Sequence, residues 1–245
     1  MHIQSFHCRI WGRTGGGGSG MLESFPVTEK PTLVLASNSP RRRQLLALTG
    51  LPFLVSAADV DESVLENENP AEYVLRLAEK KARAIHADPH QIVLGSDTTV
   101  VEGSDILGKP AHEAEAAAML TRLRGRTHQV YTGVALLRMS DGLLLKDLCV
   151  TDVPMRDYSD DEIRAYVATG DPLDKAGAYA IQHPEFHPVA GMNGCYASVM
   201  GLPLCHVTRM LRTMGIRTRS DVPEGCQRLL DYKCPVYEEI LRQTV

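Results

Sequence analysis

The sequence predicts a protein of the α/β class. Between residues 32 and 216, short apolar runs alternate with amphipathic segments, which is the pattern of a sheet covered by helices. The first of these runs, Leu33–Ala36, is followed after two residues by a strong helix start, as expected where a buried strand leads into a helix. A chain of 245 residues with 44% hydrophobic and 23% charged residues also has the composition of a globular protein with a substantial core.

Capping residues define the first two helices. The first begins at Ser39, because serine is a good N-cap and Pro40 has the fixed φ that suits the first helical position. It ends at Gly50, which readily adopts the left-handed conformation that terminates a helix. A second helix opens in the same way at Asn69-Pro70 and runs to about Ala87.

The sequence of the middle of the chain indicates one buried strand, two helices and a hairpin. The expected segments are a strand at Gln91–Val101, a helix at His112–Leu123 closed by Gly125, and strands at His128–Arg138 and Leu143–Arg156. Ser140-Asp141-Gly142 favours a tight turn that pairs the last two strands as a hairpin. Ser159 and Glu162 form the capping box of a further helix that ends at Gly170.

The last third of the folded unit predicts two strands and a final helix. We expect strands at Lys175–Gln182 and Tyr196–Val199 and a helix at Leu204–Met214. Residues 217–245 are expected to form a polar C-terminal tail with room for one short helix. The folded domain then spans residues 31–216.

Residues 1–30 are expected to be a flexible N-terminal extension. Gly15–Gly20 has the composition of a flexible linker, and Met21 offers an alternative start. This segment lacks the continuous apolar core of a secretory signal, and no apolar run in the chain approaches the ~18 residues of a membrane span. The net charge of −4 argues against general electrostatic binding of nucleic acid. The sequence therefore predicts a cytoplasmic protein with neither a membrane nor a nucleic-acid partner.

Three arginines in the first turn of a helix indicate an anion site. Arg41, Arg42 and Arg43 lie where the helix dipole is positive, which disfavours each cation by roughly 0.3–1 kcal/mol. An anion held by free backbone amides and guanidinium groups removes this conflict, and phosphate is the leading candidate. An alternative is a minor-groove DNA-binding element at Ser39–Arg42, which fits less well at a strand–helix junction of an acidic chain.

Two charged residues interrupt apolar patterns. Lys81 lies on the apolar stripe of its helix, so it either extends its amine to the edge of the stripe or meets a partner or ligand. Asp97 interrupts the buried strand that follows, where a carboxylate is either solvated at a strand end or a ligand for a metal or water.

Several loops carry further candidates. Lys109 lies on a Gly-Lys-Pro turn, and Asp59, Asp61 and Glu62 form either a metal-binding group or a solvated acidic loop. The small residues of Asp174–Gln182 would let a ligand approach the backbone closely. Arginines, lysines and carboxylates in separate loops together suit a site for a polyphosphate and a metal ion.

Six cysteines leave one question open. Their numbers are 8, 149, 195, 205, 226 and 234, and the last four gather in the final fifth of the chain. Reduced thiols acting as small apolar residues are the favoured interpretation. A structural metal site, a cluster or a disulfide remain alternatives, although no C-x-x-C pair occurs.

Taken in order, these motifs resemble the Maf family of nucleoside triphosphate pyrophosphatases. The matching segments are Ala36–Arg42, Glu79–Ala82, Gly95–Thr98, Gly108–Pro110, Asp174–Gln182 and Gly201–Leu204, and the resemblance covers about Leu33 to Ile216. It implies a fold like that of inosine triphosphate pyrophosphatases, an elongated mixed sheet with helices and two lobes around a central cleft. It also implies a homodimer.

The resemblance implies a reaction and a role for each motif. Members hydrolyse a nucleoside triphosphate between the α and β phosphates with a divalent metal, Mg²⁺ or Mn²⁺, and some have a house-cleaning role against non-standard nucleotides. Asp97 corresponds to the catalytic base, and Glu62 would assist it in metal binding. The phosphate-binding residues implied are Ser37, Arg41, Arg42, Lys81 and Lys109.

Three positions resemble the branch that acts on dTTP and UTP. These are Arg41, Thr98 and Gln182, and an amide such as Gln182 can pair with the imide edge of thymine or uracil. His183 and Pro184 replace the glycine that usually follows this glutamine, a change at the rim of the base pocket. The alternatives are a pyrophosphatase for 7-methyl-GTP or another modified nucleotide, and a nucleotide-binding regulator of septum formation.

Overall fold

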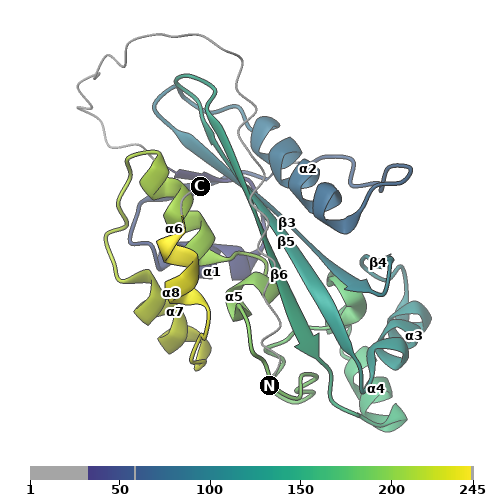
Figure 1. The fold of residues 1–245 in the computed structure, drawn as a ribbon. Coiled ribbons are helices and arrows are strands. Elements are labelled where there is room, and N and C mark those ends of the chain that lie inside the picture. The colour runs from purple at the N-terminus through teal and green to yellow at the C-terminus, as the bar shows by residue number, and fades with distance from the viewer. Residues whose placement is uncertain (1–32, 58, 244–245) are drawn as a thin grey trace.

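A six-stranded mixed sheet forms the centre of the protein (Figure 1). The computed structural model describes residues 33–57 and 59–243, so the expected extension at residues 1–30 lies outside the described residues. The strand order is β2-β1-β3-β5-β6, and β4 pairs with β3 beside this path. The strands are β1 (Leu33–Leu35), β2 (Phe53–Val55), β3 (Ile92–Glu102), β4 (Asp105–Leu107), β5 (Thr127–Arg138) and β6 (Leu144–Pro154). The long strands β3, β5 and β6 are antiparallel and give the sheet its elongated form.

Strand β1 is short, and this leaves part of β3 open. It runs parallel to β2 on one side and to β3 on the other, pairing with Ile92–Leu94. Strand β4 pairs with β3 only at Val100–Glu102. The edge of β3 between these two partners, residues 96–99, is therefore free to contribute side chains from both of its faces to one site.

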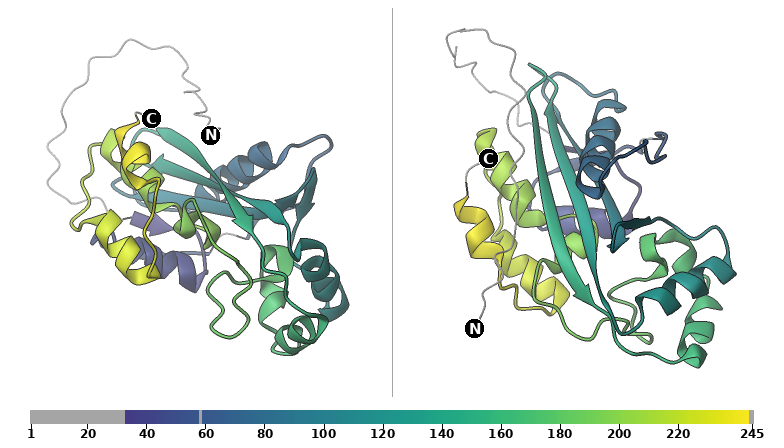
Figure 2. Two further views of the ribbon diagram at one scale, coloured as in Figure 1. Left: turned by 60° about the horizontal axis from the view of Figure 1, so that its bottom comes forward. Right: turned by 45° about the vertical axis from the view of Figure 1, so that its right-hand side comes forward.

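Helices cover both faces of the sheet (Figures 1 and 2). They are α1 (Pro40–Ala47), α2 (Pro70–Arg83), α3 (Glu113–Leu123), α4 (Asp160–Val167), α5 (Tyr196–Val199), α6 (Leu204–Thr213), α7 (Val222–Leu230) and α8 (Tyr237–Arg242). Helix α2 lies on one face, while α1 and α5–α8 lie on the other. Within the described residues, no helix is both long enough and apolar enough to cross a membrane.

Successive side chains of a strand point to opposite faces of the sheet, and β3 shows which core lies on each face. Ile92 and Leu94 of β3 pack in the core under α5 and α6, whereas Val93 between them packs against α2. A second core lies at the far end of the long strands, where Val100 of β3 packs with α3 and α4. These two cores are the centres of the two expected lobes.

Two expected strands are wrong. Lys175–Gln182 contains the second of two short 3₁₀ turns, Asp171–Asp174 and Ala176–Ala178, because Gly177 and Ala178 have positive φ angles of 67° and 61° that a strand does not contain. Tyr196–Val199 forms the one-turn helix α5. A short apolar run of this kind has no periodicity that separates a strand from a buried helical turn.

The C-terminal segment is more ordered than a polar tail. It forms two helices, α7 and α8, and both pack against α6. Val222 and Ile240 are buried there, and the carbonyl of Ile240 accepts a hydrogen bond of 3.1 Å from the guanidinium of Arg209. Asp221 caps α7 by accepting from the backbone amide of Glu224.

Candidate active site

A cleft of about 660 Å³ lies at the open edge of β3, between the two lobes. It receives side chains from the start of α1, from α2, from β3 and from the loops near residues 109 and 182. All nine residues that the sequence predicts for the site line this cleft: Ser37, Arg41, Arg42, Glu62, Lys81, Asp97, Thr98, Lys109 and Gln182.

The first turn of α1 forms the cationic side of the cleft. Arg42 donates three hydrogen bonds to neutral oxygens: its Nε to the carbonyl of Gly201 at 2.9 Å, and its terminal nitrogens to Ser37 Oγ at 3.2 Å and Thr98 Oγ1 at 3.3 Å. Ser39 caps the helix, as predicted, by accepting from the amide of Arg42. The guanidinium is thus held in one orientation without being neutralised.

Three cations of the cleft have no carboxylate partner in the structure. Among the described residues, Arg41, Arg42 and Lys109 form no salt bridge, and the first turn of α1 contains no acidic residue. Positive charge at the positive end of a helix dipole favours an anionic ligand. Guanidinium groups with free donors suit phosphate oxygens in particular.

Lys81 joins the two carboxylates on the other side of the cleft. Its Nζ lies 2.6 Å from Asp97 Oδ1 and 2.6 Å from Glu62 Oε1. Lys81 is therefore paired within the cleft, which decides between the two interpretations of its place on the apolar stripe. Lys80, the next residue, points away and donates to the carbonyl of Asp61.

Two glycines bring α2 close enough for this contact. A Cβ on Gly95 of β3 would lie 2.0 Å from the carbonyl oxygen of Ala78, and a Cβ on Gly133 of β5 would lie 2.5 Å from that of Val74. Neither residue has room for a side chain while the helix keeps its place. The close approach of helix and sheet sets Lys81 against Asp97.

The two carboxylates differ in proton affinity. Burial raises the pKa of Asp97, and the nearby positive charges of Lys81 and Arg42 only partly oppose this. Burial alone would also raise the pKa of Glu62, but the hydrogen bond and charge of Lys81, together with Lys109 and Arg42, outweigh it and lower that pKa. A buried carboxylate with a raised pKa beside an ionised one is an arrangement found at catalytic sites.

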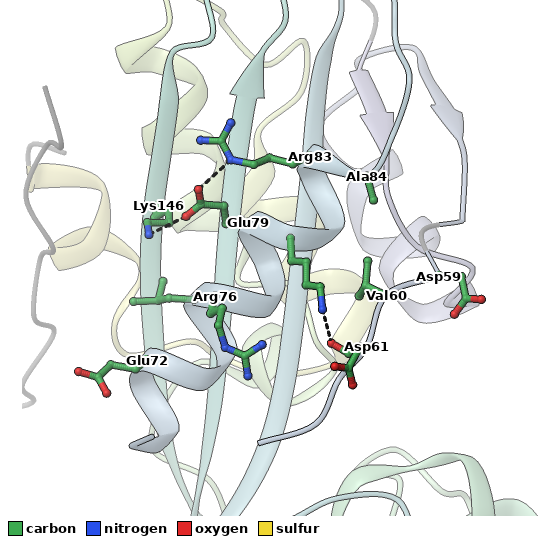
Figure 3. A pocket seen from close by; sticks show the side chains of 11 residues that line it. Asp59, Val60, Asp61, Glu72, Arg76, Glu79, Arg83, Ala84 and Lys146 are labelled. Carbon is green, nitrogen blue, oxygen red and sulfur yellow. Dashed lines mark hydrogen bonds and ion pairs between the residues drawn. The ribbon is translucent and has the colours of Figure 1, made fainter. Parts of the chain in front are cut away.

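Asp59 and Asp61 do not line the cleft. They border a separate groove of about 870 Å³ over α2, shown in Figure 3. Three charges of this groove are paired with one another, because Glu79 lies 2.8 Å from both Arg83 and Lys146. The acidic loop is therefore divided, and only Glu62 contributes to the cleft.

Comparison with known proteins identifies the family. A sequence model described as "Maf-like protein" matches residues 32–214, which is most of the chain. The chain belongs to the Maf family. The resemblance inferred from the motifs is thereby confirmed.

Maf-family relatives of known name match over most of this chain. A dTTP/UTP pyrophosphatase from Symbiobacterium thermophilum is 48% identical over 184 residues, which cover 75% of this chain and 94% of that protein. One from Moorella thermoacetica is 50% identical over 185 residues, covering 75% and 95%. Among solved structures, a HAM1 protein from Coxiella burnetii matches with a TM-score of 0.37 at 18% identity, over 52% of this chain and 74% of that one. A dITP/XTP pyrophosphatase from Mycobacterium abscessus matches with a TM-score of 0.38 at 12% identity, over 86% and 100%.

This Maf-family cleft also contains residues that the sequence did not single out. Tyr73 of α2 donates from its hydroxyl to the carbonyl of Glu62 at 2.9 Å, and burial raises its pKa to about 12. Tyr73 precedes Lys81 by eight residues, so its helical spacing was a usable signal. Ser96 is buried and does not line the cleft, but its Oγ donates to the Gly201 carbonyl at 2.8 Å, so that this carbonyl accepts from both Ser96 and Arg42.

Pairing of β5 with β3 places one further residue behind the cleft, next to Thr98. Thr132 of β5 lies opposite Thr98 of β3, and their hydroxyl oxygens are 3.0 Å apart. Thr132 also donates to the carbonyl of Ser198 at 2.9 Å. Thr98 is thus fixed between Thr132 and Arg42. Only the register of the two strands, which the sequence does not specify, brings these groups together.

The segment before Gln182 is held by an internal network. Lys175 is buried and paired with Asp171 at 2.9 Å and Asp174 at 2.5 Å. Asp171 accepts from the hydroxyl of Tyr166, and that hydroxyl in turn accepts from the amide of Ala180 at 3.0 Å. This network fixes the backbone two residues before Gln182, which is exposed at the rim of the cleft.

Proposed function

We propose that this protein hydrolyses dTTP and UTP between the α and β phosphates, releasing the nucleoside monophosphate and pyrophosphate. Support comes from the names of its relatives and from one feature of the cleft. Unpaired cations on the α1 side face a buried carboxylate of raised pKa on the β3 side. The first group suits a polyphosphate, and the second suits a water that must lose a proton.

Asp97 is the proposed general base. It accepts the proton of the attacking water, a role for which a carboxylate pKa raised towards neutrality is favourable. Lys81 holds the Asp97 carboxylate in place through its 2.6 Å contact. Ser37, Arg41, Arg42 and Lys109 bind the phosphates and stabilise the negative charge that develops on their oxygens.

The cleft fits a divalent cation of the hard class. Glu62 and Asp97 each contact the Lys81 amine at 2.6 Å through one oxygen, so the two carboxylates lie close together and each has a second oxygen that this contact does not use. Mg²⁺ is commonly held by one or two carboxylates together with water and substrate phosphates. We therefore assign Glu62 and Asp97 as its protein ligands. Bound Mg²⁺ or Mn²⁺ would neutralise phosphate charge and lower the pKa of the attacking water.

We assign selection of the nucleotide base to residues at the rim of the cleft. Gln182 offers an amide donor and an amide acceptor, which match the imide edge of thymine and uracil. Thr98 lines the cleft and accepts a hydrogen bond from the Arg42 guanidinium, so it also helps to hold that group in place. The ring of His183 packs at 4.6 Å against Tyr166, and its Nδ1 accepts from the amide of Phe186. The turn after Gln182 is therefore anchored although it lacks the usual glycine.

The test is pyrophosphate release from a panel of triphosphates with Mg²⁺ or Mn²⁺, expressed as ratios of kcat/KM. The panel contains dTTP, UTP, dCTP, dATP, GTP, dITP and 7-methyl-GTP. We expect dTTP and UTP to be preferred by at least about tenfold over purine triphosphates, the discrimination that about 1.4 kcal/mol of hydrogen bonding provides. Equal turnover of 7-methyl-GTP would contradict the base assignment alone. Nucleotide binding without any pyrophosphate release would instead indicate a regulatory protein.

A further inference from the structure

The two carboxylates of the cleft differ in how the fold supports them. Asp97 comes from the middle of β3, where pairing with β5 fixes the backbone. Glu62 comes from a loop, residues 59–68 between β2 and α2, so neither a strand ladder nor a helix fixes its backbone. A carboxylate that binds a cation has to be held in one geometry by its surroundings. Contacts outside regular secondary structure must therefore hold Glu62.

Side chains of α2 hold this loop by its backbone. The carbonyls of three successive residues, 61–63, each accept one hydrogen bond from the helix. In that order the donors are Lys80 Nζ at 2.9 Å, Tyr73 Oη at 2.9 Å and Arg76 Nη2 at 3.0 Å. The donors follow one another along the helix at intervals of three and four residues, so they lie on one face. Helix α2 thus carries both Lys81, which contacts the Glu62 carboxylate, and the groups that hold the backbone around Glu62.

Two of these contacts hold the neighbours of Glu62 rather than Glu62 itself. The Arg76 guanidinium, which holds the carbonyl after Glu62, also pairs with Glu68 through contacts of 2.5 Å and 2.6 Å. Glu68 in turn accepts from the amide of Leu65 at 3.0 Å, so the later part of the loop has a defined shape. Lys80 contacts the carbonyl before Glu62, and its replacement leaves the contact of Glu62 in place.

Tyr73 is the donor that acts on Glu62 directly. It lines the cleft, and its hydroxyl donates to the carbonyl of Glu62. Burial and the negative charges of Asp97 and Glu62 raise the pKa of Tyr73 to about 12, so the hydroxyl keeps its proton and remains a donor near neutral pH. The hydrogen bond restrains the peptide group of the residue whose carboxylate projects into the cleft. It does so without bringing a charge to the carboxylates.

We propose that Tyr73 is a positioning residue for the divalent cation, because its hydroxyl holds the backbone of Glu62 and so keeps the Glu62 carboxylate beside Asp97. The inference rests on the proposed function, in which these two carboxylates are the protein ligands of the cation. Tyr73 acts through Glu62 rather than as a ligand, since its hydroxyl is directed to the carbonyl. Groups that orient metal ligands govern metal affinity without touching the metal. Loss of the hydroxyl should therefore weaken cation binding and leave proton transfer to Asp97 intact.

The experiment is a titration of the full chain with Mn²⁺ alone, without nucleotide, in which electron paramagnetic resonance measures the free ion. Tyr73→Phe removes the hydroxyl and keeps the ring. We expect its Kd for Mn²⁺ to be about tenfold higher than that of wild type, the lower end of the loss that follows replacement of a group orienting a metal ligand. In hydrolysis of dTTP, the Mg²⁺ concentration for half-maximal rate should rise by the same factor, while kcat at saturating Mg²⁺ stays within about twofold.

Tyr131→Phe is the matched control. Tyr131 packs against the same apolar cluster as Tyr73, but its hydroxyl donates to Gln129 Oε1 at 3.0 Å and it does not line the cleft. Its Kd for Mn²⁺ should equal that of wild type. Glu62→Gln shows the effect of losing the ligand itself, and adding Tyr73→Phe to it should weaken binding no further, because Tyr73 acts through Glu62. Circular dichroism confirms that each variant is folded.

The possible outcomes separate this inference from the proposed function. An unchanged Kd in Tyr73→Phe, beside a raised Kd in Glu62→Gln, would overturn the role of Tyr73 and leave the cation ligands as assigned. Additive losses in the double variant would also overturn it, since Tyr73 would then act independently of Glu62. If wild type bound no Mn²⁺, or bound it as weakly as Glu62→Gln, Glu62 would not be a ligand and the inference would fail with that assignment. Pyrophosphate release from dTTP by wild type decides separately whether the protein is a hydrolase.

Discussion

Two buried carboxylates, one in the cleft and one in the core, show what separates a reactive acid from a structural one. Asp97 on β3 is 5% exposed and Asp147 on β6 is 4% exposed, and each contacts a cation. The pKa of Asp97 is nevertheless raised, whereas that of Asp147 is lowered. The exposed fractions of the two side chains are nearly equal, so the groups around each carboxylate have to be compared.

The difference lies in the hydrogen-bond donors. Burial alone would raise the pKa of Asp147, but His206 and Arg209 both donate to its Oδ2 and lower it, and the amide of Leu148 donates to its Oδ1. Asp97 receives its contact from Lys81, which Glu62 shares. The effect of burial therefore prevails at Asp97. A carboxylate that the fold leaves under-compensated is the one able to accept a proton from water.

The largest expected effect follows from substitution of Asp97, the reactive carboxylate of this pair. Asp97→Asn should lower kcat for dTTP by roughly 10²–10⁴-fold, because the side chain can no longer accept a proton. The free energy of unfolding should stay the same or rise, since the substitution removes a charge that burial disfavours. Steady-state kinetics and denaturant unfolding at pH 7.5 measure the two quantities. A variant that keeps most of its kcat would place the base at another residue.

Asp147, the structural carboxylate, should show the reverse: its substitution should lower stability and leave kcat nearly unchanged. Asp147→Asn leaves Arg209 and His206 buried beside a neutral group, and breaking a buried pair in this way costs about 3–5 kcal/mol. We expect this loss in the free energy of unfolding, with kcat of the folded fraction within about twofold of wild type. Urea unfolding monitored by circular dichroism measures it. If instead kcat collapsed while stability was kept, Asp147 would belong to the reaction and the comparison would fail.

The sequence predicts the reactive cluster better than the structural one. Lys81 and Asp97 are both visible as charges in apolar patterns, because an amphipathic helix and a buried strand each have a periodicity that a charge interrupts. Asp147 and His206 are 59 residues apart, and their contact depends on how α6 packs on β6. No local pattern carries that information. The same holds for the Gly201 carbonyl, which reaches Arg42 across 159 residues.

The helices and strands also differ in how well the sequence predicts them. The long elements were predicted because capping residues and periodicity mark them, as in α2, where Asn69 forms a capping box with Glu72. Strands β2 and β4 have three residues each and lie beside other strands, so their pairing partners, rather than their own sequences, define them. Lys175–Gln182 and Tyr196–Val199 were predicted as strands because their residues are small or apolar. Tertiary contacts bend them into helical turns instead.

The smallest effect concerns the pH dependence that Lys81 imposes on Asp97. The activity requires ionised Asp97, so kcat/KM falls as the pH falls through its raised pKa. The hydrogen bond and charge of Lys81 lower that pKa, as does the charge of Arg42, while the charge of Glu62 raises it. Lys81→Gln removes the first of these contributions. The midpoint of the acid limb should therefore move to higher pH, by about 1–2 units, since an opposite charge at contact distance changes a pKa by this amount.

The matched control for this shift is the adjacent lysine. Lys80→Gln removes the same charge from the same helix, but the Lys80 amine contacts the carbonyl of Asp61 outside the cleft. Its acid limb should coincide with that of wild type. Profiles of kcat/KM for dTTP from pH 5 to 9 separate the two variants, and a change in substrate affinity alone would scale kcat/KM without moving the midpoint. Equal shifts in both would mean that net charge, and not the 2.6 Å contact between Lys81 and Asp97, sets the proton affinity of the base.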